Sequence, residues 1–214
     1  MKKKIPNKEL ILRHAYSLFL QNGYNSVSIK DIMEISNLSK GAIYHHFRSK
    51  EDIFLETLEQ YFFSALDIDP DIFKGHSFRE QVKVAYMFAV DLFVKVETLE
   101  EKGVAYPIQK FYKLQLECES FPAIREKFKE SSIAYRKQIQ NLVEQGMASK
   151  EVQTGLDSES ISYQIVGMIE GVAIHNSTIE NQVGKILGGK YDRIFESYLE
   201  FICIPPKTIS PIKQ

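Results

Sequence analysis

Apolar residues recur three and four positions apart along nearly the whole chain, as they do on the buried face of a helix. No stretch alternates regularly between apolar and polar residues, so no strand pattern competes with the helical one. Capping residues, glycines and prolines divide the helical pattern into segments of different lengths. The sequence therefore predicts an all-α protein.

The expected helices have recognisable starts and stops. The first runs from about Asn7, an N-cap candidate, to Gly23, and a later helix begins at Ser49 and continues without a break through Ala65. A turn-rich loop is expected over 67–75. The remaining helices are expected from the Ser77–Glu80 capping box to about Val96, from Ile108 to Leu116, from Pro122 to Gly146, from Asp157 to about Asn176, and from about Lys190 to Ile202.

A stretch of under thirty residues near the start contains three of these helix starts. Ser28 is followed three residues later by Asp31, and Ser49 by Asp52, which is the spacing of a capping box. Ser39 lies between them and begins a helix of its own. Only two residues separate the first two helices, which leaves room for a tight turn. Two short helices joined in this way predict a helix-turn-helix, whose second helix fits the major groove of DNA.

The second helix has two different faces. Ile43 and Phe47 lie four residues apart on the face expected to be buried, whereas the outward face carries small, cationic and hydrogen-bonding side chains. Lys40, Gly41 and Ala42 are candidates for reading bases. Ser28, Tyr44, His45 and Lys50 are candidates for contacting phosphates. Tyr44 and Phe47 could instead be core aromatic residues of a small helical domain, and His45 and His46 could be a solvated pair. The candidate DNA contacts are Ser28, Ser39, Lys40, Gly41, Ala42, Tyr44, His45 and Lys50.

The first quarter of the chain resembles the TetR/AcrR family of bacterial transcriptional repressors. Ser36 and Asn37 replace the Ala and Gly that the family usually has before the turn, and Leu38 replaces a common Val. These differences affect the turn and the operator preference more than the fold. The matching positions are Ile11-Leu12, Ala15, Phe19, Gly23-Tyr24, Ile32, and the run Ser39-x-Gly41-x-x-Tyr44-x-x-Phe47-x-Ser49-Lys50-Glu51.

The resemblance implies two domains, a helix-turn-helix DNA-binding domain over 1–50 and a helical ligand-binding and dimerisation domain over 51–214. It also implies a homodimer joined by the last two long helices. The segments 161–174 and 191–202 are apolar around much of their circumference, as a dimer seam requires, although an ordinary buried core would give the same pattern. The resemblance places an inducer pocket in the body, where the candidate lining residues are Tyr61, Tyr86, Met87, Phe111, Tyr112, Tyr135, Met168 and His175.

Charge is unevenly distributed along the chain. The net charge of the whole chain is −1, but residues 1–50 hold nine Lys and Arg against three acidic residues, a net charge of +6. The other residues carry a net charge of −7. A basic segment on an acidic body is typical of a protein that contacts the phosphate backbone at one end.

Other chemistry has little support in the sequence. The two cysteines, Cys118 and Cys203, lie far apart and lack metal-site spacing, so we expect reduced, mostly buried thiols, no metal and no cofactor. No apolar run is long enough for a signal core or a membrane span, and a cytoplasmic location is expected. The sequence contains no metalloprotease, phosphate-binding-loop or nucleophile-elbow motif, so none of these motifs supports an enzyme.

The sequence thus predicts a ligand-responsive regulator, a repressor that binds a palindromic double-stranded DNA operator as a dimer and leaves it when a small molecule binds. An alternative is a ligand-independent chromosome- or division-associated DNA-binding protein of the same fold. An enzyme is a third possibility, with His175, Ser177 and Glu170 as its imaginable acid–base group.

Overall fold

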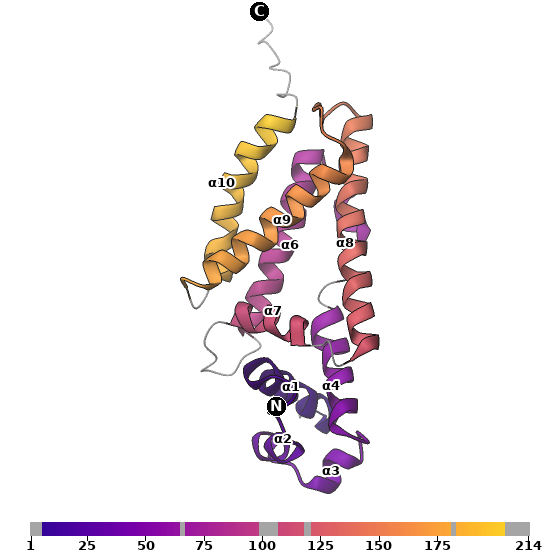
Figure 1. The fold of residues 1–214 in the computed structure, drawn as a ribbon, viewed down its shortest axis with the longest axis vertical. Helices are drawn as coiled ribbons and strands as arrows, with labels where there is room; N and C mark the ends of the chain where they lie inside the picture. Colours follow the sequence, from indigo (N-terminus) through magenta and orange to yellow (C-terminus); the bar gives the residue numbers. More distant parts are fainter. Residues whose placement is uncertain (1–5, 65–66, 99–106, 118–120, 181–182, 204–214) are drawn as a thin grey trace, which may run out of the picture.

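The computed structural model describes residues 6–64, 67–98, 107–117, 121–180 and 183–203, and the described part is almost entirely helical. Figure 1 shows an elongated molecule with a small helical head at one end, formed by α1 (Asn7–Asn22), α2 (Ile29–Ser36) and α3 (Lys40–Tyr44). The larger body contains α6 (Phe78–Thr98), α8 (Pro122–Ala148), α9 (Ser158–Ser177) and α10 (Gly184–Ile202). Between them, α4 (Lys50–Leu58) leads from the head into the body, and α7 (Pro107–Glu117) crosses the junction.

The head is built around the buried face of α1. Ile11, Ala15 and Phe19 are almost completely buried there, and the helix ends at Gly23, whose φ of 76° suits glycine. The helix starts at Asn7, as expected, but Asn7 is not its N-cap. Asn7 is the first helical residue and Pro6 is the N-cap, without a side-chain capping bond.

The caps predicted for the helix-turn-helix are confirmed. The Ser28 side chain accepts from the Asp31 N–H at 3.2 Å, while the Asp31 carboxylate accepts from the Ser28 N–H at 2.7 Å. Ser39 caps α3 by accepting from the Ala42 N–H. The turn between the helices passes through Asn37 in the left-handed conformation, with φ 52°, which asparagine tolerates better than most residues.

The helix from Ser49 continues without a non-helical break to Ser64, as expected, but it changes from an α-helix to a π-helix on the way. Ser49 caps α4 as predicted, but Asp52 accepts from the N–H of Arg48 and so does not close the expected box with Ser49. After Leu58 the chain forms a π-helical segment, η1 (Glu59–Phe63). Such a segment changes the direction of the side chains that follow it.

Head and body share one hydrophobic core at their junction. Phe62 of η1 stacks on Phe111 of α7, with ring centroids 4.2 Å apart and planes inclined by 10°. Both side chains belong to the same buried cluster as the core of α1, together with Leu92 and Val96 of α6. The predicted boundary at residue 50 lies where α4 begins, and buried residues from both sides of it belong to this shared core.

The body forms a second core around α6. Tyr86 and Phe195 stack with centroids 4.9 Å apart and bring α6 against α10, while α8 packs against α9. The expected loop over 67–75 contains a short 3-10 helix, η2 (Pro70–Phe73), whose Phe73 is buried. The starts of α6 at the Ser77–Glu80 box and of α9 after Asp157 agree with the sequence.

The last helix begins at Gly184, six residues before the expected Lys190. Its first turn is capped from α6, because Glu97 Oε1 accepts from the N–H groups of Val183 and Gly184 at 2.7 and 2.9 Å. A Cβ at Gly184 would lie 2.8 Å from Val94, so glycine permits the close approach of α10 to α6. At its other end, Cys203 forms an isolated bridge with Val152.

Two further expectations concern the cysteines and the membrane. Cys203 is a buried free thiol, as expected, while Cys118 lies outside the described residues. Within the ranges that the structure describes, none of the helices combines the length and the apolar character needed to cross a membrane.

Candidate nucleic-acid interface and body cavity

α3 lies at the far end of the head (Figure 1). Lys40, Gly41 and His45 are exposed, and Tyr44 keeps 46% of its surface accessible although it is a large aromatic residue. The Lys40 ammonium lies 5.7 Å from the centroid of the Tyr44 ring, so the two form a cation–π pair on the exposed face of α3. The face therefore offers hydrogen-bond donors beside small residues, as contact with base edges and phosphates requires.

The residues around this face support it in the way the sequence predicts. Ile43 and Phe47 are buried in the head core, and Ala42 is half-buried. Ser39 is exposed at the start of α3, where unpaired backbone N–H groups favour an anion. His46 is half-buried with its ring 6.3 Å from that of Phe47, which agrees with a structural role.

Ser28 is exposed at the start of α2, but its hydroxyl is already engaged. It donates to the Asp31 carboxylate at 2.7 Å while accepting from the Asp31 N–H. Hydrogen bonds from the Ser28 backbone and hydroxyl lower the pKa of Asp31, which is therefore charged at neutral pH. A phosphate approaching Ser28 has to compete with this carboxylate for the hydroxyl proton.

Lys50 is placed differently from the other candidate contacts. Its ammonium donates to the carbonyl oxygens of Tyr24 and Val27, each at 2.9 Å, and lies 4.0 Å from the centroid of the Tyr24 ring. The side chain is half-buried and ties the start of α4 to the α1–α2 connection. Two of its three N–H donors are thus used within the head, which leaves at most one for DNA.

One exposed cation near α3 was missed from the sequence. Arg48 follows the buried Phe47 and lies just before the cap of α4, and its side chain is exposed. The signal was available, since Arg48 is one of the basic residues of segment 1–50 and directly precedes the capping residue Ser49. We add Arg48 to the candidate DNA contacts.

The body contains a small cavity of about 90 Å³ between α6, α7, α8 and α9. Most of its wall is aromatic, with a few polar groups among the rings. The aromatic wall comprises Phe88, Phe93, Phe111, Tyr112, Phe128 and Tyr135, and the polar groups belong to Gln115, Ser131, Ser132, Glu170 and the two tyrosines.

The structure brings three of the eight predicted pocket residues to this cavity, namely Phe111, Tyr112 and Tyr135. The other five lie elsewhere. Tyr61 packs against Tyr16 of α1, the Tyr86 hydroxyl donates to Asp192 at 2.6 Å, Met87 and Met168 are half-buried against the body core, and His175 is exposed on α9. Helical spacing identifies the buried face of a helix but not which neighbour that face meets.

The polar side of the cavity is defined by Tyr135 and Glu170. The Tyr135 hydroxyl is buried and has no hydrogen-bond partner among the described residues. Burial, and secondarily the charge of Glu170, raises the pKa of Tyr135, and the same two causes in the same order raise that of Tyr112. Burial also raises the pKa of the Glu170 carboxyl, although the side chain as a whole is exposed, so Glu170 lies at the rim.

A larger groove of about 1220 Å³ adjoins the cavity, and Ile68, Ser131 and Tyr135 line both. It runs between α8 and the segment from η1 to η2, and most of its lining side chains are polar or charged. An apolar ligand gains little burial in such an open groove, so the smaller aromatic cavity is the better candidate for its binding site. No group of three or more His, Cys, Asp or Glu among the described residues is arranged to hold a metal ion.

Comparison with known proteins finds sequence relatives of the part of the chain that contains the helix-turn-helix. A family model described as "Bacterial regulatory proteins, tetR family" matches residues 11–57. The transcriptional regulator QacR of Staphylococcus aureus is 47% identical over 51 residues, 24% of this chain and 27% of QacR, so the chain spans about a quarter of that relative.

Solved structures are similar over nearly the whole chain. The ketosteroid transcriptional regulator KstR2 of Mycobacterium tuberculosis has a TM-score of 0.70 at 17% identity, covering 95% of this chain and 98% of KstR2. A transcriptional regulator from Saccharomonospora viridis in complex with choline has a TM-score of 0.67 at 18% identity, covering 92% and 98%. At such identities the likeness concerns the fold.

Proposed function

Because the chain belongs to the TetR/AcrR family of transcriptional regulators, we propose that it represses transcription as a homodimer on a palindromic operator and is released by a small molecule. The observation that carries this proposal is the exposed face of α3. It presents Lys40, Gly41 and Tyr44 at the tip of the head, on a helix held from behind by Ile43 and Phe47.

In the proposed complex, α3 enters the major groove. Lys40, Gly41 and Ala42 read base edges, while Tyr44, His45 and Arg48 contact phosphates and set the register. Two copies of α3 related by a two-fold axis reach successive major grooves about 34–36 Å apart, or a longer palindrome if they lie farther apart.

The proposed dimer forms through α9 and α10, because these helices expose apolar side chains on the outside of the body. Phe201 of α10 is 75% exposed and Ile174 of α9 is 44% exposed. Gly167 and Gly171 are exposed on the same helix as Ile174, and nothing lies within 4 Å of a Cβ placed on either. A second copy packed there covers this apolar surface, and the glycines allow the helices to approach closely.

The proposed inducer binds in the aromatic cavity of the body. The cavity is lined by residues of α6, α7, α8 and α9. One of them, Phe111, stacks on Phe62 of η1, the segment that directly follows α4. A ligand that fits the cavity better in one arrangement of these helices shifts the dimer toward that arrangement. The shift is limited by the difference between the ligand's affinities for the two arrangements. The S. viridis regulator solved with choline shows that a protein of this fold binds a small molecule.

The test begins with the DNA that the protein captures from genomic fragments, followed by gel shifts with a captured fragment. We expect a specific shift that a metabolite extract from the same cells abolishes, and that Tyr44→Ala weakens strongly. A chain that shifts no fragment specifically is not a DNA-binding regulator. A specific shift that survives every metabolite fraction identifies a ligand-independent chromosome-associated protein instead.

A further inference from the structure

Charge in the aromatic cavity is entirely of one sign. Of the described side chains that line it, Glu170 is the one that can ionise near neutral pH, and none is a lysine, arginine or histidine. An anionic ligand therefore finds no counter-charge in the lining, whereas a cation finds a carboxylate. Burial is the cause of the raised pKa of the Glu170 carboxyl, and no described residue forms a salt bridge with it, so no cation of the described part of the chain pairs with its charge.

The surroundings of Glu170 strengthen this asymmetry. Burial is the largest cause of the raised pKa values of Tyr112 of α7, Tyr135 of α8 and Tyr191 of α10, and the nearby charge of Glu170 adds to each. These hydroxyls stay protonated near neutral pH, and the Tyr191 hydroxyl donates to the carbonyl of Ile169 at 2.6 Å. The Tyr135 hydroxyl is still free to bond a ligand, because no described residue pairs with it.

The wall chemistry matches the charge. Rings of Phe88, Phe93, Tyr112 and Tyr135 line the space, and aromatic faces attract cations, most strongly where water is excluded. At about 90 Å³ the cavity is small compared with the pockets that hold drug-sized molecules, so it suits a compact head group. Ser131 and Tyr135 line both this cavity and the adjoining groove, so a longer substituent would lie on that side.

We propose that this cavity binds an organic cation, an ammonium group with small apolar substituents, whose nitrogen lies against the aromatic rings beside Glu170. The inference rests on the proposed function only in treating this ligand as the inducer. Glu170 supplies the counter-charge at the rim, the rings enclose the alkyl groups, and Tyr135 donates its hydroxyl hydrogen bond to a polar group on the substituent. Neutral compounds of the same shape bind through the rings alone, and anions of the same shape are excluded by Glu170.

Three probes of nearly equal shape test this selection by calorimetric titration of the full-length protein. Choline carries the cation, 3,3-dimethylbutan-1-ol is its neutral isostere, and 3,3-dimethylbutanoate is an anion with the same bulky end. We expect choline to bind at least about tenfold more tightly than the alcohol, and the anion not to bind. The proposal is overturned if choline gives no binding up to millimolar concentrations, or if the alcohol or the anion binds as tightly.

Two variants locate the binding. Glu170→Gln keeps the shape and removes the charge, and we expect it to lose at least about tenfold in choline affinity while binding the alcohol unchanged. Glu130→Gln removes an exposed carboxylate from a different helix, α8, and should leave the affinities for choline and for the alcohol unchanged. Equal losses in the two variants would mean a general effect of net charge, which overturns the role of Glu170.

The titrations contain no DNA, so they fail or succeed independently of the operator experiment. A protein that binds choline through Glu170 but no DNA fragment contradicts the proposed function alone. A protein that binds its operator and releases it only for a neutral or anionic metabolite contradicts this inference alone.

Discussion

The ammonium of Lys50 donates to the main-chain carbonyl of Tyr24 at 2.9 Å and also lies 4.0 Å from the centroid of the Tyr24 ring. One side chain thus holds both the backbone and the ring of a residue 26 positions away. The Tyr24 ring in turn lies 4.7 Å from both Phe54 and Phe121, so the contact connects the head to the start of α8. Lys50 is therefore a structural part of the head, whatever it contributes to DNA binding.

Replacement of Lys50 by methionine should destabilise the protein by about 1–3 kcal/mol, because two carbonyl groups lose a charged donor while the aliphatic stem is kept. Urea unfolding measures this loss, and Lys40→Met on the exposed face of α3 is the control that should leave stability unchanged. If Lys50 mainly neutralised a phosphate, stability would stay constant and the salt dependence of operator binding would fall by about one phosphate contact.

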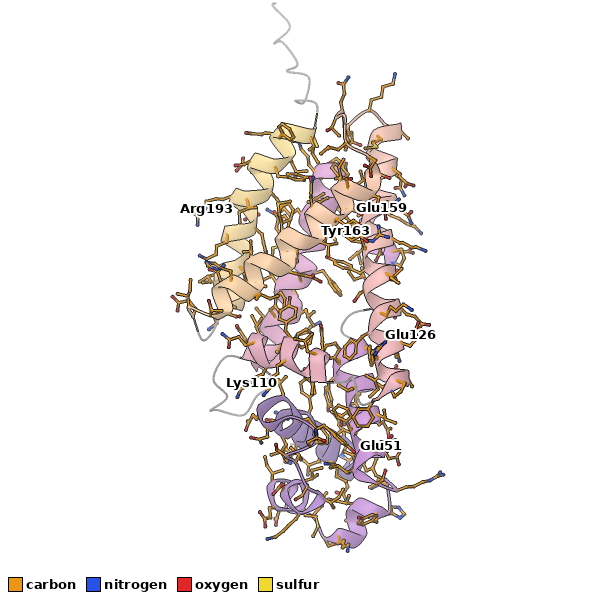
Figure 2. The ribbon with its side chains drawn as sticks, viewed as in Figure 1. Glu51, Lys110, Glu126, Glu159, Tyr163 and Arg193 are labelled. Atoms are coloured by element: carbon orange, nitrogen blue, oxygen red, sulfur yellow. The ribbon has the colours of Figure 1, made fainter. Side chains whose placement is uncertain are left out.

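Removal of the Tyr44 hydroxyl should weaken operator binding evenly across sequences. Tyr44→Phe loses one hydrogen bond to phosphate, worth about 1 kcal/mol or roughly fivefold in affinity, and the fold should be unaffected because the side chain is exposed. Fluorescence anisotropy with labelled duplexes over a salt series measures the change. Tyr163→Phe, at a similarly exposed tyrosine of α9, is the matched control (Figure 2). Parent-like binding of Tyr44→Phe at every salt concentration would exclude this contact.

A charge at Phe201 should prevent dimer formation. Phe201→Glu places a carboxylate on the most exposed apolar position of α10, where a partner subunit would have to bury it without a counter-charge. Sedimentation analysis should then give a folded monomer with weak operator binding. Leu116→Glu changes an equally exposed leucine on α7 and should remain dimeric. A dimeric Phe201→Glu protein would place the interface elsewhere.

The capping box of α2 should make stability depend on pH in the acid range. The Ser28 hydrogen bonds lower the pKa of Asp31, so the folded state binds this proton less readily than the unfolded chain does. The stabilisation is complete above the unfolded pKa of about 4 and is lost as pH falls through the lower folded pKa. Thermal unfolding of the parent and of Asp31→Asn from pH 7 to pH 2.5 should therefore converge at the acid end. A constant difference down to pH 2.5 would mean that the Asp31 charge does not contribute.

The helix-turn-helix could be predicted from the sequence because the interactions that define it are local. Ser28, Ser39 and Ser49 each bond a backbone N–H three residues away, so their spacing alone identifies the helix starts. The start of α10 was missed because its cap is Glu97, which lies 87 residues earlier in the chain. The π-helical segment after Leu58 was missed for a similar reason, since Phe62 and Phe63 pack against α7 and α8.

The body cavity was predicted less well than the DNA-binding face. Tyr86 and Tyr112 have the same sequence signature, an aromatic residue on the buried stripe of a helix, yet the structure pairs Tyr86 with Asp192 and places Tyr112 on the cavity. Glu170 was noticed in the sequence only as an imaginable acid–base group. Its position among three tyrosines from other helices depends on how those helices pack.

The cap that Glu97 provides has a mechanical consequence. α6 forms one wall of the cavity and also caps the first turn of α10. A ligand that displaces α6 therefore also displaces the start of α10, a helix proposed to join the two subunits. Ligand affinity and subunit affinity must then influence each other equally, as thermodynamic linkage demands. Inducer potency should consequently vary with protein concentration over the range in which subunits associate.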